Sequence, residues 1–143
     1  AVAAELTAQG APPAGVILID THHGGRDDVR LLALMSEDRD RPDEQFTDLI
    51  EDSVVIAGGG YVRIFDGWRP EPLPVPTVLL RAGPTRHMRE LDPRHDWRAR
   101  WPVRHDVIDI PGDHGSVLGA DAATTAAAMR SWLRTLPNEQ EEL

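Results

Sequence analysis

Asp20 and His114 are the two residues of this sequence whose types and positions best fit proton-transfer chemistry. Asp20 ends the apolar run GVILID, and His114 follows the run DVIDIPGD. If both runs are strands of a parallel sheet, both side chains stand at its carboxyl edge, where catalytic groups gather in such folds. An Asp that orients a proton-carrying His is the supporting pair of a hydrolytic triad. Each residue also has an ordinary alternative: Asp20 as a turn or capping residue, and His114 as a solvated loop histidine.

The nucleophile that such a pair would serve has no signature in the sequence. In α/β-hydrolases the triad follows the order Ser, Asp, His, and the Ser lies in a G-x-S-x-G turn that opens a helix. No serine of the chain lies in that motif; the serines are Ser36, Ser53, Ser116 and Ser131. Ser116 follows His114 within the same loop instead of opening a helix. We therefore expect the nucleophile upstream of residue 1, before the helix that the Ala-rich residues 1–9 predict.

Three further side chains are candidates for lining an acyl channel beside Asp20: His22, His23 and Tyr61. Two adjacent histidines on an extended segment point to opposite sides, and no H-x-H or H-x-x-x-H spacing occurs. We therefore expect no metal site, although Asp27 and Asp28 are close in sequence. Tyr61 could instead pack inside the protein without lining a channel.

The alternation of apolar runs with breakers predicts an α/β fold. Residues 1–9 predict a helix with Gly10 at its end, and residues 120–136 predict an amphipathic one. Three short apolar runs predict strands: GVILID, TVLLRAG and HDVIDIPG. Residues 84–104 are expected to be irregular. Strands that alternate with helices indicate a parallel sheet.

The segment between the first two predicted strands is too long for a simple crossover. Its residues 27–52 hold ten acidic residues and three Arg. We expect a helical lid over about residues 26–68, with a hinge or close-packing point at Gly58–Gly60. Residues 137–143 are expected to be a polar tail.

Composition excludes several classes of function. With 143 residues the chain has room for one domain, and its net charge of −9 argues against a nucleic-acid partner. Its apolar runs are too short to cross a bilayer. It has no cysteine, and all fifteen basic residues are Arg. Thiol and Schiff-base chemistry are therefore excluded, and we expect a cytoplasmic protein with no cofactor of its own.

Three segments carry a resemblance to a known family: GVILIDTHHGG, VPTVLLRAGPT and WPVRHDVIDIPGDHGSVLGADAATTAAAMRSWL. They resemble the thioesterase domains that end type I modular polyketide synthases. In that family a G-V-V-L-[IV]-D strand bears the catalytic Asp. After a lid and a P-T-[LV]-L-[LV] strand, a W-P-x-x-H-x-x-x-x-[IV]-P-G-[DN]-H segment bears the catalytic His. The similarity spans roughly residues 1–136, and the family's G-H-S-x-G turn is absent.

This resemblance implies that residues 1–136 are the C-terminal half of a thioesterase domain with an α/β-hydrolase fold. Asp20 and His114 would be two members of its triad. The Ser would take a polyketide chain from the phosphopantetheine of an acyl carrier domain, and hydrolysis or macrolactonisation would release it. Its partners would be the acyl carrier domain, the N-terminal half of the same domain and, in a homodimer, a second copy. Without the Ser, this chain alone would be inactive.

Two other classes of protein stay open. One is a stand-alone editing thioesterase or a nonribosomal-peptide thioesterase, and the other is a non-catalytic fragment of an α/β-hydrolase. Labelling by a fluorophosphonate probe would separate the catalytic classes from the last.

Residues 81–104 form a basic segment in an acidic protein. They hold seven Arg and three acidic residues. They could be a solvated loop with internal ion pairs. Alternatively, Arg86, Arg89 and Arg94 could steer the docking of an acidic carrier domain.

Overall fold

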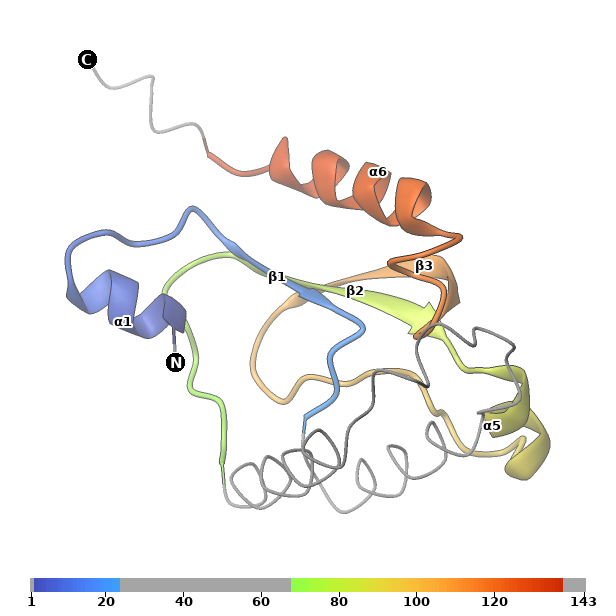
Figure 1. Ribbon diagram of the computed structural model, residues 1–143. Coiled ribbons are helices and arrows are strands. Elements are labelled where there is room, and N and C mark those ends of the chain that lie inside the picture. Colours follow the sequence, from blue (N-terminus) through green and yellow to red (C-terminus); the bar gives the residue numbers. More distant parts are fainter. Residues whose placement is uncertain (1, 24–67, 138–143) are drawn as a thin grey trace, which may run out of the picture. The chain divides into compact units, whose positions relative to one another are not determined.

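The computed structural model describes residues 2–23 and 68–137. The chain divides into two compact units, residues 1–21 with 70–143 and residues 22–69. Every described helix and strand belongs to the first unit (Figure 1). The predicted lid and the Gly58–Gly60 hinge fall almost entirely on residues 24–67, which lie outside the described residues. All of the predicted tail except Pro137 also lies outside them, so these assignments stay predictions.

A parallel sheet of three strands forms the centre of the first unit. β1 (Val16–Ile19) pairs with β2 (Thr77–Gly83), and β2 pairs with β3 (Asp106–Asp113). Both pairings are parallel, and the strand order is β1-β2-β3. All three strands lie where the apolar runs predict them, and their carboxyl ends meet at one edge of the sheet.

β2 is the buried central strand. Four consecutive residues, Thr77 to Leu80, are buried, as a parallel strand covered on both faces requires. β3 lies at the edge of the described sheet and is mostly exposed. The core joins β2, β3, the turn after β3 and the helix over residues 122–133; its members are Val78, Leu80, Ala82, Ile110, Val117 and Trp132.

Helix α6 (Ala122–Leu133) covers one face of this sheet. Figure 1 shows it running along β2 and β3. Its anchor is Trp132, which is 5% exposed. Gly15, just before β1, leaves room for this indole, because a Cβ at Gly15 would approach the ring to 2.7 Å. The base of β1 and the last turn of α6 are therefore closely packed.

The helices agree with the predicted ones except at one place. α1 (Val2–Ala8) ends before Gly10, which has a φ of 77°. The expectation of an irregular segment at 84–104 is wrong for its first part, where α5 (Arg86–Leu91) forms. Thr85 caps α5 by accepting a hydrogen bond from the N–H of Met88, and Met88 is buried. A short helix thus forms because one cap and one apolar anchor support it.

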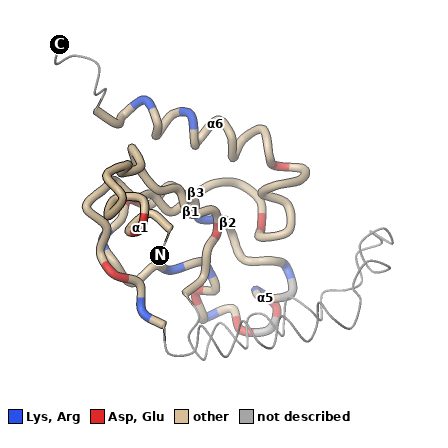
Figure 2. The backbone as a smooth tube through the Cα atoms, turned by 60° about the vertical axis from the view of Figure 1, so that its left-hand side comes forward, with Lys and Arg blue, Asp and Glu red and all other residues tan. Residues whose placement is uncertain are grey.

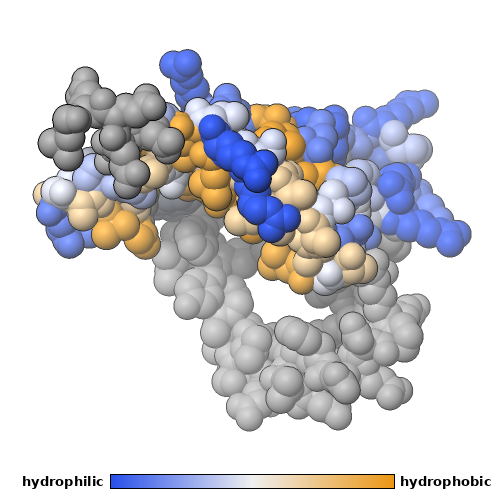
Figure 3. All heavy atoms as spheres, turned by 90° about the horizontal axis from the view of Figure 1, so that it is seen from above, coloured by the Kyte–Doolittle hydropathy of each residue, from blue (hydrophilic) through white to orange (hydrophobic). Residues whose placement is uncertain are grey.

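The surface of the first unit mixes polar and apolar side chains. Figure 3 shows hydrophobic atoms among hydrophilic ones on the side of α6. The most exposed large hydrophobic residues of the described chain are Val2 and Leu118. α6 is the longest described helix, with 12 residues. Among the described residues, no helix has both the length and the apolar character to cross a membrane.

Candidate active site

Asp20 is held at the carboxyl end of β1 by its backbone and by its side chain. Its N–H donates to the carbonyl of Leu80 (2.8 Å), which extends the β1–β2 ladder by one residue. Its Oδ1 accepts the N–H of Ala82 (2.9 Å). The side chain is therefore fixed to the central strand and is buried, with 5% of it exposed.

The backbone of Asp20 is in the left-handed region, with a φ of 40°. This region is unfavourable for residues other than Gly, although Asp tolerates it better than most. A conformation of this kind costs about 1–3 kcal/mol and persists where the surroundings impose it, often at functional sites. The two hydrogen bonds to β2 supply that constraint.

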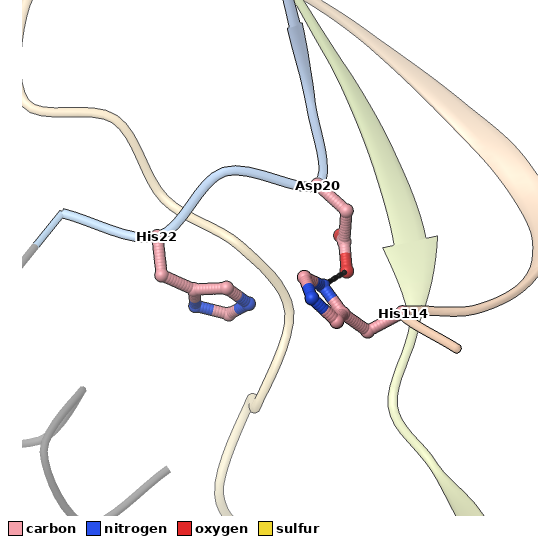
Figure 4. Close-up of side chains that lie close together, drawn as sticks. All are labelled: Asp20, His22 and His114. Atoms are coloured by element: carbon pink, nitrogen blue, oxygen red, sulfur yellow. Dashed lines mark hydrogen bonds and ion pairs between the residues drawn. The ribbon is translucent and has the colours of Figure 1, made fainter. Parts of the chain in front are cut away.

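His114 meets Asp20 from the other end of the chain. It follows the last residue of β3, and its Nδ1 lies 3.0 Å from Asp20 Oδ2. Figure 4 shows the imidazole directed at the carboxylate. Half of the His114 side chain is exposed, whereas Asp20 is buried. The pair thus has a fixed acid and an accessible imidazole.

This geometry determines the tautomer that the pair favours. A carboxylate can only accept hydrogen bonds, so Nδ1 of His114 carries the proton that it donates to Asp20. In the neutral imidazole Nε2 is then the nitrogen that can accept a proton. This is the arrangement of a general base oriented by a buried acid.

The pKa of His114 is raised above its ordinary value. The main cause is the hydrogen bond to Asp20, and the negative charges of Asp20 and Asp113 add to it. Burial acts in the opposite direction and lowers the pKa. The imidazolium form is therefore stabilised, as a base that receives a proton during a reaction requires.

We expect the raised pKa to appear in a titration of His114. Its midpoint in the intact protein should lie above about 6.5, the ordinary value for histidine. Asp20→Asn should lower it, because the amide has no charge to stabilise the imidazolium. NMR of the imidazole C2 proton measures both midpoints. Because the base must be neutral, the rate of any step in which His114 accepts a proton should rise as pH passes through this pKa. Equal midpoints in the two proteins would contradict the assignment.

The predicted channel residues lie in the second unit. His22 and His23 follow Asp20 by two and three residues. The ring of His23 lies 5.9 Å from that of Trp68, centroid to centroid. Tyr61 lies outside the described residues. The structure thus brings Asp20 and His114 together, and the substrate-binding roles of the other three stay predictions.

Ser116 does not have the hydrogen bonds of a nucleophile activated by His114. Its Oγ accepts the N–H of Asp113 (2.9 Å) and lies 3.2 Å from the carbonyl oxygen of Asp113, to which it donates. Both bonds tie the hydroxyl to the backbone of the same turn. Its place in the sequence argues against a nucleophile, but the sequence carries no signal for this structural use of the hydroxyl.

The basic segment 81–104 is largely neutralised by ion pairs. Arg81 contacts Asp109 (2.7 Å), and Arg98 contacts Asp96 (2.8 Å). The other ion pairs that Arg residues of this segment make with described residues are Arg98–Asp109, Arg100–Asp96 and Arg86–Glu90. Figure 2 shows basic and acidic positions close together around α5. Of the seven Arg, the three that make no ion pair with another described residue are Arg89, Arg94 and Arg104.

Comparison with known proteins finds relatives over nearly the whole chain. Polyketide synthase GfsE of Streptomyces halstedii is 38% identical over 140 residues, 95% of this chain. Spectinabilin polyketide synthase system protein NorC of Streptomyces orinoci is 33% identical over 144 residues, 98% of the chain. Erythronolide synthase EryA3 of Saccharopolyspora erythraea is 33% identical over 135 residues, 93% of the chain. The chain spans only 4%, 6% and 4% of these proteins, respectively. No family model matches the sequence.

Proposed function

We propose that this chain is the C-terminal portion of an α/β-hydrolase-fold thioesterase that releases acyl chains in polyketide biosynthesis. The observation that carries the proposal is the hydrogen bond of 3.0 Å between His114 Nδ1 and Asp20 Oδ2 at the carboxyl edge of a parallel sheet. Similarity to polyketide synthase proteins over nearly the whole chain supports the biosynthetic context.

In this proposal the bond-making atom is a serine Oγ outside the printed sequence. The Oγ attacks the carbonyl carbon of an acyl thioester while Nε2 of His114 takes its proton. The carbon–sulfur bond then breaks, and His114 returns the proton to the departing thiolate. An acyl ester of the serine and a free thiol are the products of this first half.

The second half repeats the chemistry with a different nucleophile. Water, or a hydroxyl of the acyl chain, attacks the ester while His114 again takes the proton. His114 then protonates the serine oxygen, and an acid or a lactone leaves. Asp20 keeps the imidazole in the required tautomer and stabilises the imidazolium in both halves.

A small acyl thioester tests this reaction in the intact protein. We expect free thiol to appear and a covalent acyl adduct to be detectable by mass spectrometry on a serine. Thiol release without an adduct on serine would contradict the proposed mechanism. If no thiol is released and no adduct forms, the result favours the alternative of a non-catalytic α/β-hydrolase fragment.

We further propose that the thioester arrives on the phosphopantetheine of an acyl carrier domain, with an acidic surface that meets the unpaired part of the basic segment. Charge complementarity of this kind speeds encounter more than it tightens the final complex. Arg89 and Arg94 are exposed and make no ion pair within the described chain. They are better candidates than Arg86, which lies 2.7 Å from Glu90.

The double variant Arg89→Ala/Arg94→Ala should slow transfer from the carrier by about 2- to 30-fold, the factor expected for two exposed ion pairs. It should leave the rate with a small thioester unchanged, and the difference should shrink at high salt. Arg130→Ala/Arg134→Ala removes two exposed charges from the end of α6 and is the matched control. Equal slowing by the two double variants, or equal slowing with both substrates, would exclude this docking surface.

A further inference from the structure

His114 lies in a turn, and two neighbouring residues close this turn by hydrogen bonding to each other. The N–H of Asp113 donates to Ser116 Oγ (2.9 Å), and the N–H of Ser116 donates to Asp113 Oδ1 (3.1 Å). Such a pair, three residues apart, is a capping box, which usually joins Ser or Thr to Glu or Gln at a helix start. Here it encloses the residue that contacts Asp20.

Additional bonds fix the backbone on both sides of His114. The N–H of Gly115 donates to Asp113 Oδ1 (3.0 Å). The carbonyl oxygen of Asp113 accepts the N–H of Ser116 (3.0 Å) and that of Val117 (3.1 Å). Val117 is buried in the core. The turn is thus anchored to the core on one side and to the end of β3 on the other.

The entry and exit of the turn are packed against each other as well. Gly112 has a φ of 90°, which only glycine adopts easily. A Cβ at this position would overlap Ser116 Oγ and the carboxylate of Asp121. The N–H of Asp121 in turn donates to the carbonyl of Ser116 (2.9 Å). Asp121 precedes α6 but makes no side-chain capping bond to it. Its contacts with Gly112 and Ser116 pack the start of the helix closely against the turn.

We propose that Asp113 and Ser116 are positioning residues, whose capping box sets the backbone orientation that directs His114 Nδ1 toward Asp20. The proposal explains why the chain has a serine beside the base that is not its nucleophile. Its consequence for turnover rests on the proposed thioesterase function. Its consequence for the geometry of His114 does not.

The carboxylate of Asp113 has two separable properties, a hydrogen-bonding oxygen and a charge. Its charge contributes to the raised pKa of His114, together with that of Asp20. Asp113→Asn keeps an oxygen that can accept the N–H groups of Gly115 and Ser116 but removes the charge. Asp113→Ala removes both, and Ser116→Ala removes only the hydroxyl, which Ser116→Thr retains.

NMR of histidine-labelled intact protein tests the geometry directly. The proton on Nδ1 of His114, held by Asp20, should give a low-field signal. We expect Asp113→Ala and Ser116→Ala to weaken or abolish it by faster exchange, and Asp113→Asn and Ser116→Thr to retain it. Asp113→Asn should also lower the pKa of His114. A low-field signal unchanged from wild type in both Asp113→Ala and Ser116→Ala would overturn the proposal.

Turnover of a small thioester provides the second readout. The two Ala variants should lower kcat by about 2- to 30-fold, as the loss of a capping interaction implies, with KM unchanged. Asp92→Ala is the control, since Asp92 Oδ1 caps the N–H of Arg94 in an exposed turn elsewhere. If Asp113→Ala fails to fold, the kcat and the His114 signal of Ser116→Ala are compared with those of Ser116→Thr, and that comparison tests the positioning role. The two proposals can fail separately. If the Asp113→Ala and Ser116→Ala variants change the His114 signal but His114→Ala loses no activity, the positioning role is supported and the proposed function is refuted.

Discussion

Replacing His114 by Ala is expected to lower the rate of acyl transfer from a small thioester by about 10⁴- to 10⁶-fold. The imidazole is the only group in this account that takes and returns the proton in both halves of the reaction. Its side chain is half exposed and does not belong to the core cluster, so its removal should not disrupt the sheet. The measurement is kcat/KM for thiol release by the intact protein.

His95→Ala is the matched control for this variant. His95 is exposed, and its ring contacts that of Trp97 in a tilted arrangement, with centroids 4.2 Å apart. The same substitution there should leave the rate within about 2-fold of wild type, as surface changes away from special features usually do. A loss of less than 10-fold in His114→Ala would show that another residue acts as the base.

Asp20→Asn should have a comparably large effect for a different reason. Asn tolerates the left-handed backbone conformation, and its side-chain oxygen can accept the N–H of Ala82 as Asp20 Oδ1 does. Its amide nitrogen would then face His114 Nδ1 as a donor, which favours the tautomer with the proton on Nε2. A proton on Nε2 blocks the base, and we expect kcat to fall about 10⁴-fold.

Asp106→Asn removes the same charge from the start of β3 and is the control for Asp20→Asn. Asp106 is exposed, and its side chain makes no hydrogen bond or ion pair within the described residues. The kcat of the Asp106→Asn variant should therefore match that of the wild-type protein. Thermal unfolding of both variants shows whether each of them is still folded. A folded Asp20→Asn protein with near wild-type turnover would contradict the orienting role of Asp20.

The sheet and the contact between Asp20 and His114 could be predicted from the sequence because both follow from local patterns. Each apolar run is short and bounded by breakers, so its extent fixes a strand. The side chain at its carboxyl end then falls at the common edge of a parallel sheet. Asp20 and His114 lie 94 residues apart in sequence. The common carboxyl edge of the parallel strands is the reason to expect them to be close in space.

The turn around His114 could not be read from the sequence in this way. Its capping box has Ser in the place where the usual pattern has Glu or Gln, so D-H-G-S carries no familiar signature. The function of Ser116 depends on the φ of Gly112 and on contacts with Asp121, which are tertiary features. Helix α5 has only six residues, too few for a recognisable apolar periodicity in the sequence. The Thr85 cap three residues before the apolar Met88 was the available signal.

The ion pairs of the basic segment also needed the fold. Arg81 and its partner Asp109 lie on neighbouring strands, 28 residues apart in sequence. By composition alone Arg81 belongs to a surplus of positive charge, whereas the register of β2 and β3 places Arg81 and Asp109 opposite each other. The area available for steering a partner is therefore smaller than the residue count implied.

Fluorophosphonate labelling of the intact protein tests whether Asp20 and His114 form a catalytic pair, because the probe reacts with a serine that a His–Asp pair has activated. We expect stoichiometric labelling of one serine, which is none of Ser36, Ser53, Ser116 and Ser131. We also expect His114→Ala and Asp20→Asn to lower the labelling rate by at least about 10³-fold, whereas Asp106→Asn should not. Labelling at the same rate in the His114→Ala variant, or no labelling of the wild-type protein, would contradict the claim that Asp20 and His114 form a catalytic pair.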